Sequence, residues 1–171
     1  MLLSKGGSMG RILRSERLVL KELHNDYIPD YLDMFSPMVQ RILGVPSTAL
    51  EGAYLATQLQ KQKEGRTHFY CIFYKENEHL IGSIEIRSPE HRGQLYTWLH
   101  EDYWHAGFFA EAFRVAVQDY FKYNPQVTTF TARVDISNER SFKALLKVGC
   151  VVAMRSRGPR EDQYELVCGA A

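Results

Sequence analysis

The sequence has little of what marks a secreted, membrane-spanning or nucleic-acid-binding protein. Among its 171 residues are three cysteines, Cys71, Cys150 and Cys168, with neither a CxxC pair nor a zinc spacing. Such a sparse, odd number is typical of a reducing compartment, so we expect three scattered, buried thiols in a cytoplasmic protein. No stretch of about 18 apolar residues is present, which predicts no membrane segment. The net charge of +1 gives no bulk attraction to nucleic acid or to an anionic membrane.

Two common catalytic chemistries also lack their motifs. There is no GxSxG for a serine hydrolase. The histidines show no metal-ligand spacing such as HExxH, so no metal is expected; they are His24, His68, His79, His91, His100 and His105.

What is present describes an ordinary globular domain. Hydrophobic residues make up 45% and charged residues 24% of the chain. The length suits one compact domain, which we place at residues 11–171. Residues 1–10 are small and polar rather than a signal sequence, and we expect a flexible leader or cloning remnant there, with Met9 a candidate natural start.

Hydrophobic periodicity and turn residues predict an alternation of strands and helices. Thr48 and Glu51 have the spacing of a capping box, and Pro37 and Pro46 punctuate a loop. The expected strands are 11–23, 67–75, 80–87, 94–100, 127–134, 151–155 and 163–167, and the expected helices are 25–35, 48–65, 107–124 and 138–148. This order predicts an α/β fold with a mixed sheet and helices on both faces.

The segment from Trp98 to Ala112 is the first candidate for chemistry. A strand ends there, a turn carries Gly107, and a helix starts at once. A helix N-terminus offers unpaired N–H groups and a partial positive charge, which suit a pyrophosphate. The alternative is an ordinary strand–helix turn in which glycine only permits a tight bend.

The segment from Ser137 to Cys150 is the second candidate. Asn138 is well placed to cap a helix, and Ser141 lies one turn further on, where its hydroxyl could point into the space between two helices. Each has a plainer alternative. Asn138 could do no more than cap the helix, and the Ser141 hydroxyl could merely bond the backbone.

Together these segments resemble the GNAT superfamily of N-acetyltransferases, and more narrowly its Rim-type branch, which acetylates protein N-termini. SERLVLKEL resembles the branch's RLxLR strand, and HLIGSIEI its third strand. LYTWLHEDYWHAGFFAEA resembles YWLxPxYWGxGYATEA, SNERSFKALLKVGC resembles NxxSxxLLxKxGF, and QYELV resembles the closing strand. The resemblance covers nearly the whole domain. It implies the GNAT fold, with a central mixed, mostly antiparallel sheet of about six to seven strands flanked by about four helices.

The resemblance also implies a cosubstrate, acetyl-CoA, and direct transfer of its acetyl group to an amine without a covalent enzyme intermediate. The pyrophosphate would lie on the backbone amides of His105, Ala106, Gly107, Phe108, Phe109 and Ala110. The N–H of Leu99 or His100 would polarise the thioester carbonyl. Asn138 would hold the pantetheine, and Ser141 would protonate the departing thiolate. Arg140, Lys143 and Lys147 either meet the adenosine phosphates or, as we favour, form a solvated helix face.

Three positions depart from the family pattern. Phe109 stands where a small residue is usual, so its side chain must point into the core. Ala106 replaces a basic residue or glutamine. Gln94 replaces a glutamate and cannot accept a proton from an ammonium group, so another base is needed. Our first candidate is Glu85; its alternative is a surface glutamate paired with Arg87.

Weaker candidates for the base are His100, Glu161 and a chain of waters. A peptide α-amine has a pKa of about 7.7–8.0 and needs little help, which mildly favours it over a lysine side chain as the acceptor. The acceptor is therefore expected to be a peptide N-terminus or a small amine. In the fold that the resemblance implies, the acceptor pocket would be built largely by residues 26–65 and 155–163, with Tyr27, Tyr31, Phe35, Met38 and Tyr54 as core or pocket wall.

Two other functions remain open at this point. Gln94 and Phe109 give some weight to a catalytically weak protein of the same fold that binds an acyl-CoA as a sensor or partner-binding subunit. A nucleic-acid-binding domain is disfavoured by the charge. The oligomeric state is expected to be a monomer or a homodimer.

Overall fold

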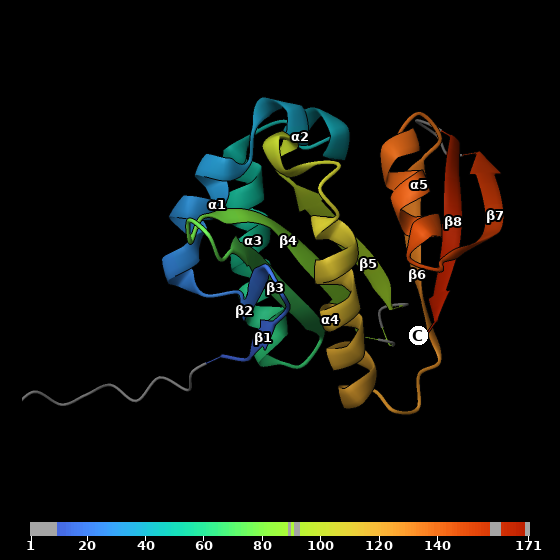
Figure 1. Ribbon diagram of the computed structural model, residues 1–171, viewed down its shortest axis with the longest axis horizontal. Helices are drawn as coiled ribbons and strands as arrows, with labels where there is room; N and C mark the ends of the chain where they lie inside the picture. The colour runs from blue at the N-terminus through green and yellow to red at the C-terminus, as the bar shows by residue number, and fades with distance from the viewer. Residues whose placement is uncertain (1–9, 89, 91–92, 158–161, 170–171) are drawn as a thin grey trace, which may run out of the picture.

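A computed structural model describes residues 10–88, 90, 93–157 and 162–169. In this part of the chain eight strands form one sheet in the order β1-β2-β3-β4-β5-β6-β8-β7, in which β5 and β6 are parallel and all other neighbours antiparallel (Figure 1). The predicted α/β fold class is confirmed. The strands are β1 (Ile12–Arg14), β2 (Leu18–Glu22), β3 (Thr67–Tyr74), β4 (Leu80–Arg87), β5 (Gln94–Leu99), β6 (Thr129–Asp135), β7 (Val151–Arg157) and β8 (Asp162–Gly169).

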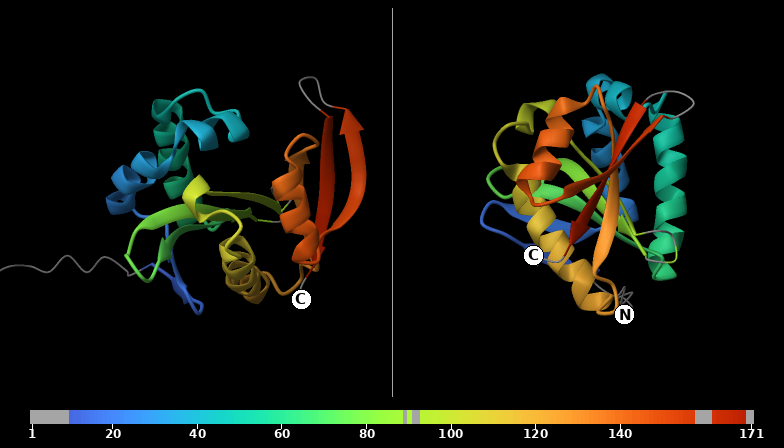
Figure 2. Two further views of the ribbon diagram at one scale, coloured as in Figure 1. Left: turned by 45° about the horizontal axis from the view of Figure 1, so that its top comes forward. Right: turned by 90° about the vertical axis from the view of Figure 1, so that its right-hand side faces the viewer.

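Five α-helices in the described residues surround this sheet. They are α1 (Ile28–Met34), α2 (Pro37–Leu43), α3 (Thr48–Lys63), α4 (Phe108–Tyr123) and α5 (Glu139–Lys147), and two 3-10 turns are η1 (Asn25–Tyr27) and η3 (Glu101–Tyr103). Helices α1 and α3 cover one face of the sheet, and α4 covers the other (Figure 2). Helix α5 lies against β6, in the part of the domain that also holds β7 and β8.

Two apolar cores follow from the alternation of side chains in the central strands. In β3, Tyr70 and Ile72 point into the core under α4, whereas Phe69, Cys71 and Phe73 point into the core under α1 and α3. A strand buried on both faces is nearly all apolar or aromatic, which is the pattern of residues 67–75. Successive side chains of a strand point to opposite faces, so one central strand contributes to both cores.

Two segments contain more structure than the sequence predicted. The single strand expected over residues 11–23 is a hairpin, because Ser15 to Arg17 turn the chain and the Ser15 N–H donates to the Leu18 carbonyl (3.1 Å). The loop expected around Pro37 is helix α2. Proline is compatible with the first helical position, and Ser36 caps the helix by accepting from the Val39 N–H (3.1 Å).

The capping box predicted for Thr48 and Glu51 is wrong. Ser47 is the N-cap of α3, and its hydroxyl accepts from the Leu50 N–H (3.3 Å). Glu51 therefore lies a turn inside the helix, where its carboxylate accepts from the Tyr31 hydroxyl of α1 rather than bonding back to the cap. This one-residue shift brings an acid into the interior of the domain.

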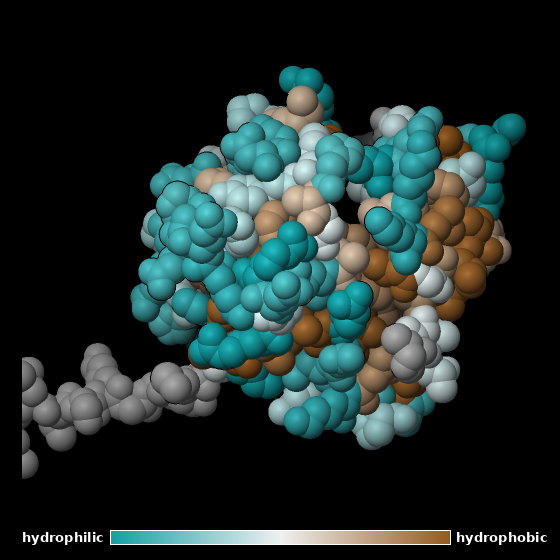
Figure 3. Space-filling view, viewed as in Figure 1, coloured by the Kyte–Doolittle hydropathy of each residue, from teal (hydrophilic) through white to brown (hydrophobic). Residues whose placement is uncertain are grey.

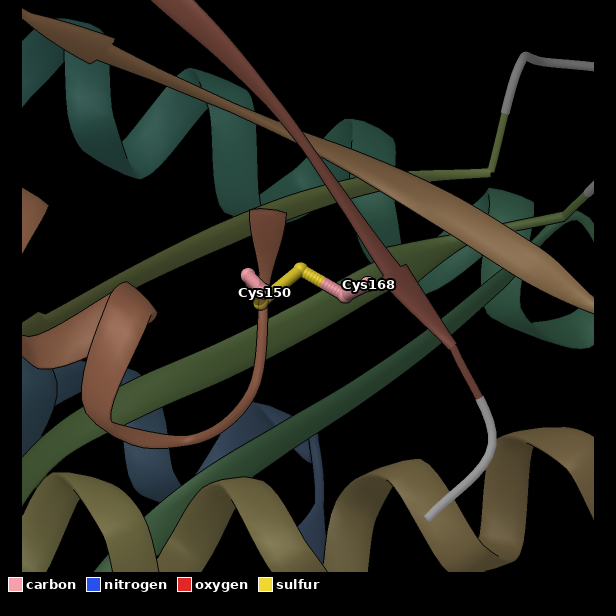
Figure 4. Close-up of a disulfide and its surroundings, with 2 residues drawn as sticks. All are labelled: Cys150 and Cys168. Carbon is pink, nitrogen blue, oxygen red and sulfur yellow. A yellow bond between two sulfur atoms is a disulfide. The ribbon is translucent and has the colours of Figure 1, made fainter. Parts of the chain in front are cut away.

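The prediction of three separate thiols is also wrong. Cys150 and Cys168 form a disulfide with a Cα–Cα distance of 4.3 Å (Figure 4), whereas Cys71 is free and buried as expected. Val151 pairs with Val167. Cys150, which precedes Val151, therefore lies beside Cys168, which follows Val167. The cysteine count therefore no longer supports a reducing compartment. None of the described helices is both long and apolar enough to cross a membrane.

Two further expectations fall on residues outside the described part of the chain. The expected leader covers residues 1–10, of which only Gly10 is described, and Glu161 belongs to the 158–161 segment between β7 and β8. A single domain over residues 11–171 and a leader before it stay predictions.

We predict that the disulfide can be counted chemically. After denaturation without a reductant, a thiol reagent should label one cysteine, Cys71, and after reduction it should label all three. Replacing Cys150 and Cys168 together by serine should lower the free energy of unfolding by about 2–4 kcal/mol, measured by urea denaturation. Labelling of three thiols without reduction would contradict the pairing.

Candidate functional site

The sheet divides between β5 and β6. These strands pair only at Gln94–Thr131 and Leu95–Ala132, and beyond these residues they separate (Figure 1). The space-filling view shows this face hollowed between α5 and the rest of the domain (Figure 3). The end of β5 therefore offers one edge whose backbone groups are not taken up by β6.

The alternation of hydrogen bonds in β5 separates the two predicted backbone donors. The His100 N–H donates to the Ile81 carbonyl (2.9 Å), so it is committed to β4. In an antiparallel ladder consecutive N–H groups point to opposite sides. The Leu99 N–H therefore faces the divided edge, and of the two candidates it is the available one.

A tight contact fixes the position of this strand end. A Cβ added to Gly82 would lie 2.2 Å from the Trp98 carbonyl oxygen, so no larger residue fits there. The register of β3 and β4 also shifts beside Gly82, which leaves Ile81 as an extra residue. Such a bulge bends a strand locally and re-aims its neighbours.

The turn from His105 to Gly107 leads directly into α4. Gly107 is the N-cap with φ 81°, and His105 has φ 64°, a left-handed conformation that is uncommon outside glycine. No described residue accepts a hydrogen bond from the backbone amides of residues 105–110. Residues 105–107 are exposed, so these N–H groups form a cradle that fits an anion such as a pyrophosphate.

Arg17, in the turn that precedes β2, holds the cradle in place. Arg17 donates to the Ala106 carbonyl (3.0 Å) and through Nε to Glu111 in the first turn of α4 (2.8 Å), and its guanidinium lies over the Phe108 ring. Glu111 also accepts from the Ser15 hydroxyl (2.7 Å). Burial alone would raise the Glu111 pKa, but these donors outweigh it and hold the pKa below its usual value.

Phe109 does not obstruct the cradle. Its ring packs against the core under α4, 5.6 Å from the Phe113 ring centroid. This is the orientation that a cofactor-binding turn requires of a bulky residue at that position. Ala106 presents its carbonyl to Arg17 and adds no side-chain contact to an anion.

Trp104 connects the cradle with α5. Its indole N–H donates to the Leu99 carbonyl (2.8 Å), and the Arg140 guanidinium lies 3.3 Å from the centre of its ring. Arg140 is therefore not the solvated helix residue that we favoured. This contact holds the start of α5 beside the end of β5.

The two predicted residues on α5 lie at its first turn. Asn138 is the N-cap, and its side chain accepts from the Ser141 N–H (3.2 Å), so its capping role is confirmed. The Ser141 side chain is half-buried, and its hydroxyl has no hydrogen-bond partner among the described residues. This hydroxyl is therefore available to another hydrogen-bond partner.

Glu85 lies at the floor of a pocket rather than on the surface. The pocket has a volume of about 380 Å³ and is bounded by α1, α2, α3, β3, β4 and β5. Glu85 is 1% exposed and accepts from Thr67 (2.7 Å) and from the Tyr54 hydroxyl. Arg87 does lie beside it, with Nε 3.5 Å from Oε1. The alternative of a surface glutamate is wrong.

The same pocket holds a second acid that we did not predict. Glu51 is 6% exposed and accepts from the Tyr31 hydroxyl (2.8 Å), which in turn accepts from the Trp98 indole N–H (2.7 Å). The sequence did contain a signal: Glu51 lies on the same face of the helix as the apolar Leu55. We missed it because we interpreted Glu51 as part of a capping box. Of the predicted wall residues, Tyr31 and Tyr54 line the pocket, Phe35 is core, and Met38 is exposed.

Gln94 and His100 have structural partners. Gln94 accepts from the Tyr96 hydroxyl (2.8 Å). His100 caps η3 through Nδ1, which accepts from the Asp102 N–H (3.2 Å). The described residues contain no group of three or more His, Cys, Asp or Glu side chains placed to hold a metal.

Comparisons with known proteins agree with this geometry. The sequence matches the family model of the acetyltransferase (GNAT) domain over residues 17–151. A search of curated proteins found no match.

Several solved structures share the fold. The ribosomal-protein-S5-alanine acetyltransferase from Vibrio fischeri has a TM-score of 0.76 at 18% identity, covering 94% of this chain and 97% of that one. RimL, a ribosomal L7/L12 alpha-N-protein acetyltransferase in complex with coenzyme A, has a TM-score of 0.80 at 13% identity, covering 94% of this chain and 100% of that one. The Salmonella typhimurium acetyl transferase that modifies the N-terminal serine of L7/L12 has a TM-score of 0.81 at 12% identity, covering 93% of this chain and 99% of that one.

We predict that Glu111 stabilises the cradle in a pH-dependent way. Because its folded pKa is lowered, its stabilisation is present above the unfolded pKa of about 4.3 and is lost as the pH falls through the folded pKa. Glu111→Gln should lower the free energy of unfolding by about 1.5–3 kcal/mol at pH 7. Urea denaturation should show a smaller difference from wild type at pH 3.5.

The exposed Glu139, paired with Lys143 on the surface of α5, provides a matched control. Glu139→Gln should change stability by less than about 0.5 kcal/mol at either pH. A Glu111→Gln deficit of the same size at pH 7 and pH 3.5 would show that the carboxylate charge is not what stabilises the turn.

Proposed function

This chain belongs to the GNAT acetyltransferase family, and we propose that it transfers the acetyl group of acetyl-CoA to the α-amine of a peptide or protein N-terminus. Membership of the family makes the protein an acyltransferase that acts on an amine. The acceptor, the mechanism and the roles of single residues are the proposal. A cytoplasmic location and a monomer or homodimer belong to it as well.

One observation carries the proposal: the cradle of unpaired amides and the pocket with two buried acids lie on either side of the divided edge of β5. The cradle amides belong to residues 105–110, and the pocket includes Tyr96, Thr97 and Trp98 of the same strand. A cosubstrate anchored at the start of α4 would extend along β5 toward the pocket. The RimL structure with coenzyme A supports acyl-CoA as that cosubstrate.

When bound, acetyl-CoA supplies an activated thioester. In the proposal the amides of residues 105–110 bind the pyrophosphate, with the exposed His105 beside it. The Asn138 side chain holds the pantetheine while it caps α5. The Leu99 N–H donates to the acetyl carbonyl oxygen, where negative charge develops during transfer; loss of such a donor typically lowers the rate about 100- to 1000-fold.

Two proton relays accompany the reaction, one through Tyr54 and one through Ser141. The Tyr54 hydroxyl already donates to Glu85, so it can accept a proton from the ammonium group as its own proton passes to Glu85. The resulting amine forms the new C–N bond while the C–S bond breaks. Ser141 gives its proton to the sulfur and regains one from the second N–H of the acceptor, through water. Proton transfer by placed side chains contributes about 100- to 10,000-fold.

The choice of an α-amine rests on two supports. The solved structures of similar fold include enzymes described as acting on protein N-termini. An α-amine with a pKa of about 7.7–8.0 is also partly neutral near pH 7, so a base buried behind Tyr54 suffices.

A catalytically weak acyl-CoA sensor is less well supported than it was from the sequence. That alternative rested on Phe109 and Gln94. Phe109 packs into the core, and Glu85 provides an acid in the pocket that Gln94 does not.

We predict that acetyl-CoA raises the melting temperature in a concentration-dependent manner, because a ligand that binds only the native state stabilises it. A thiol-release assay with peptides that carry free N-termini should then show turnover. Binding without turnover across a broad panel of peptides, polyamines and aminoglycosides would favour the sensor. No thermal shift at millimolar acetyl-CoA would count against both.

Ser141→Ala should lower kcat about 100-fold or more while leaving the acetyl-CoA-induced thermal shift unchanged, because the hydroxyl acts on the departing thiolate. Ser137→Ala is the matched control, since the exposed Ser137 hydroxyl has the Asp135 carboxylate (2.5 Å) as its one partner in the described part of the chain. Unchanged turnover in Ser141→Ala would remove this residue from the mechanism.

Glu85→Gln and Tyr54→Phe should each lower kcat about 100-fold or more, because either change interrupts the proposed proton route. The double variant should be little slower than either single one, since both act in one step. Additive losses, or full activity in Glu85→Gln, would contradict the route.

A further inference from the structure

The two acids of the pocket differ in their charge balance. Glu85 has a cationic partner, Arg87, with Nε 3.5 Å from its Oε1. Among the described residues, no lysine, arginine or histidine lies within ion-pair distance of Glu51. An ionised carboxylate that is 94% buried without a cation is unfavourable, so Glu51 is the group in this pocket that a bound cation would neutralise.

Glu51 is held in place with one oxygen left open. Its Oε1 accepts from Tyr31, and Tyr31 is fixed by the Trp98 indole N–H and lies 3.3 Å from the Ser83 hydroxyl. No described residue donates to Oε2, yet Oε2 is not sealed in the interior and Glu51 lines the pocket. Both oxygens of Glu85, by contrast, already accept hydrogen bonds, from Thr67 and Tyr54.

Burial and the nearby Glu85 charge together raise the Glu51 pKa, against the effect of the Tyr31 hydrogen bond. An ammonium group between the two carboxylates would relieve that repulsion. The geometry alone thus provides one open acceptor oxygen for one positive charge.

The walls of the pocket are apolar. No lysine or arginine is among its lining residues, and its hydrocarbon surface includes Leu43, Val45, Pro46, Leu50, Phe69 and Trp98. A carboxylate on the ligand would find no cation among the lining residues, because the nearby Arg87 is already paired with Glu85, and a second ammonium group would lie against hydrocarbon. Both would lose hydration without compensation.

We infer that the acceptor of this enzyme is a primary amine with a single positive charge, held by Glu51, whose neighbouring group is apolar and carries no carboxylate. The inference rests on the proposed function. A peptide N-terminus with an apolar first side chain has this chemistry, and so has a small arylalkylamine. Free amino acids, polyamines and peptides with an acidic first residue do not.

The first test measures binding in the presence of CoA, so that no transfer occurs. The probes are a leucyl tripeptide amide and its N-acetylated form, which lacks the charge. Wild type should bind the free amine about tenfold or more tightly than the acetylated form, as expected of a hydrogen bond to a charged group. Glu51→Gln should abolish this preference while keeping the affinity for the acetylated form.

Two further variants make this result specific. Glu64→Gln, at the exposed C-terminal end of the same helix, should keep the full preference, and Glu51→Asp should keep part of it. The inference is overturned if Glu51→Gln retains the preference, or if it weakens both ligands equally, because equal loss would mean a structural role.

The second test compares kcat/KM over acceptors. The leucyl tripeptide amide or phenethylamine should exceed an aspartyl tripeptide amide, free leucine and spermidine by about tenfold or more, and the better of the first two identifies the source of the amine. Equal rates for the acidic peptide or spermidine would overturn the inference. If no amine is acetylated but the Glu51-dependent binding preference holds, the proposed function fails while the ammonium site stands.

Discussion

The division of the sheet between β5 and β6 is the constraint on which the rest of the molecule depends. In the described part of the chain only two residue pairs join these strands, so beyond Leu95 the strand β5 has a strand partner on the β4 side alone. Elsewhere in a sheet an unpaired edge is a liability. Here that edge lies between the start of α4 and the pocket under α1 to α3, so one strand end can serve two ligands. The contact of Gly82 with the Trp98 carbonyl keeps β4 against that strand end.

Two buried acids would destabilise this domain if neither had compensation, and the structure compensates them differently. Glu85 has Arg87 and two hydroxyl donors, whereas Tyr31 is the single donor to Glu51 among the described residues. A fully neutralised acid is stable without a ligand, and an incompletely neutralised one gains most from a bound cation. This asymmetry is our reason to assign proton transfer to Glu85 and recognition of the ammonium group to Glu51.

The sequence predicted well what local patterns determine. The helix start at Gly107, the Asn138 cap and the central strands all follow from spacing within a single element. It failed where two distant segments had to be brought together. The partners of Cys150 and of Glu51 lie 18 and 20 residues away in the chain, and the position of Arg140 on Trp104 depends on how α5 meets β5. Glu51 was also assigned to a capping box that starts at Thr48. The N-cap is Ser47, one residue earlier.

The disulfide connects the closing strands to α5, the helix that carries Asn138 and Ser141 at its start. Cys150 directly follows the turn that ends α5, and Cys168 lies in β8, which pairs with β6. The bond therefore anchors the C-terminal end of the helix whose first turn carries Asn138 and Ser141. At its other end the helix is held by the stacking of Arg140 on Trp104. Because β5 and β6 pair so briefly, these two attachments, together with the packing of α5 on β6 and the stacking of Phe142 on Tyr164, fix the position of this first turn.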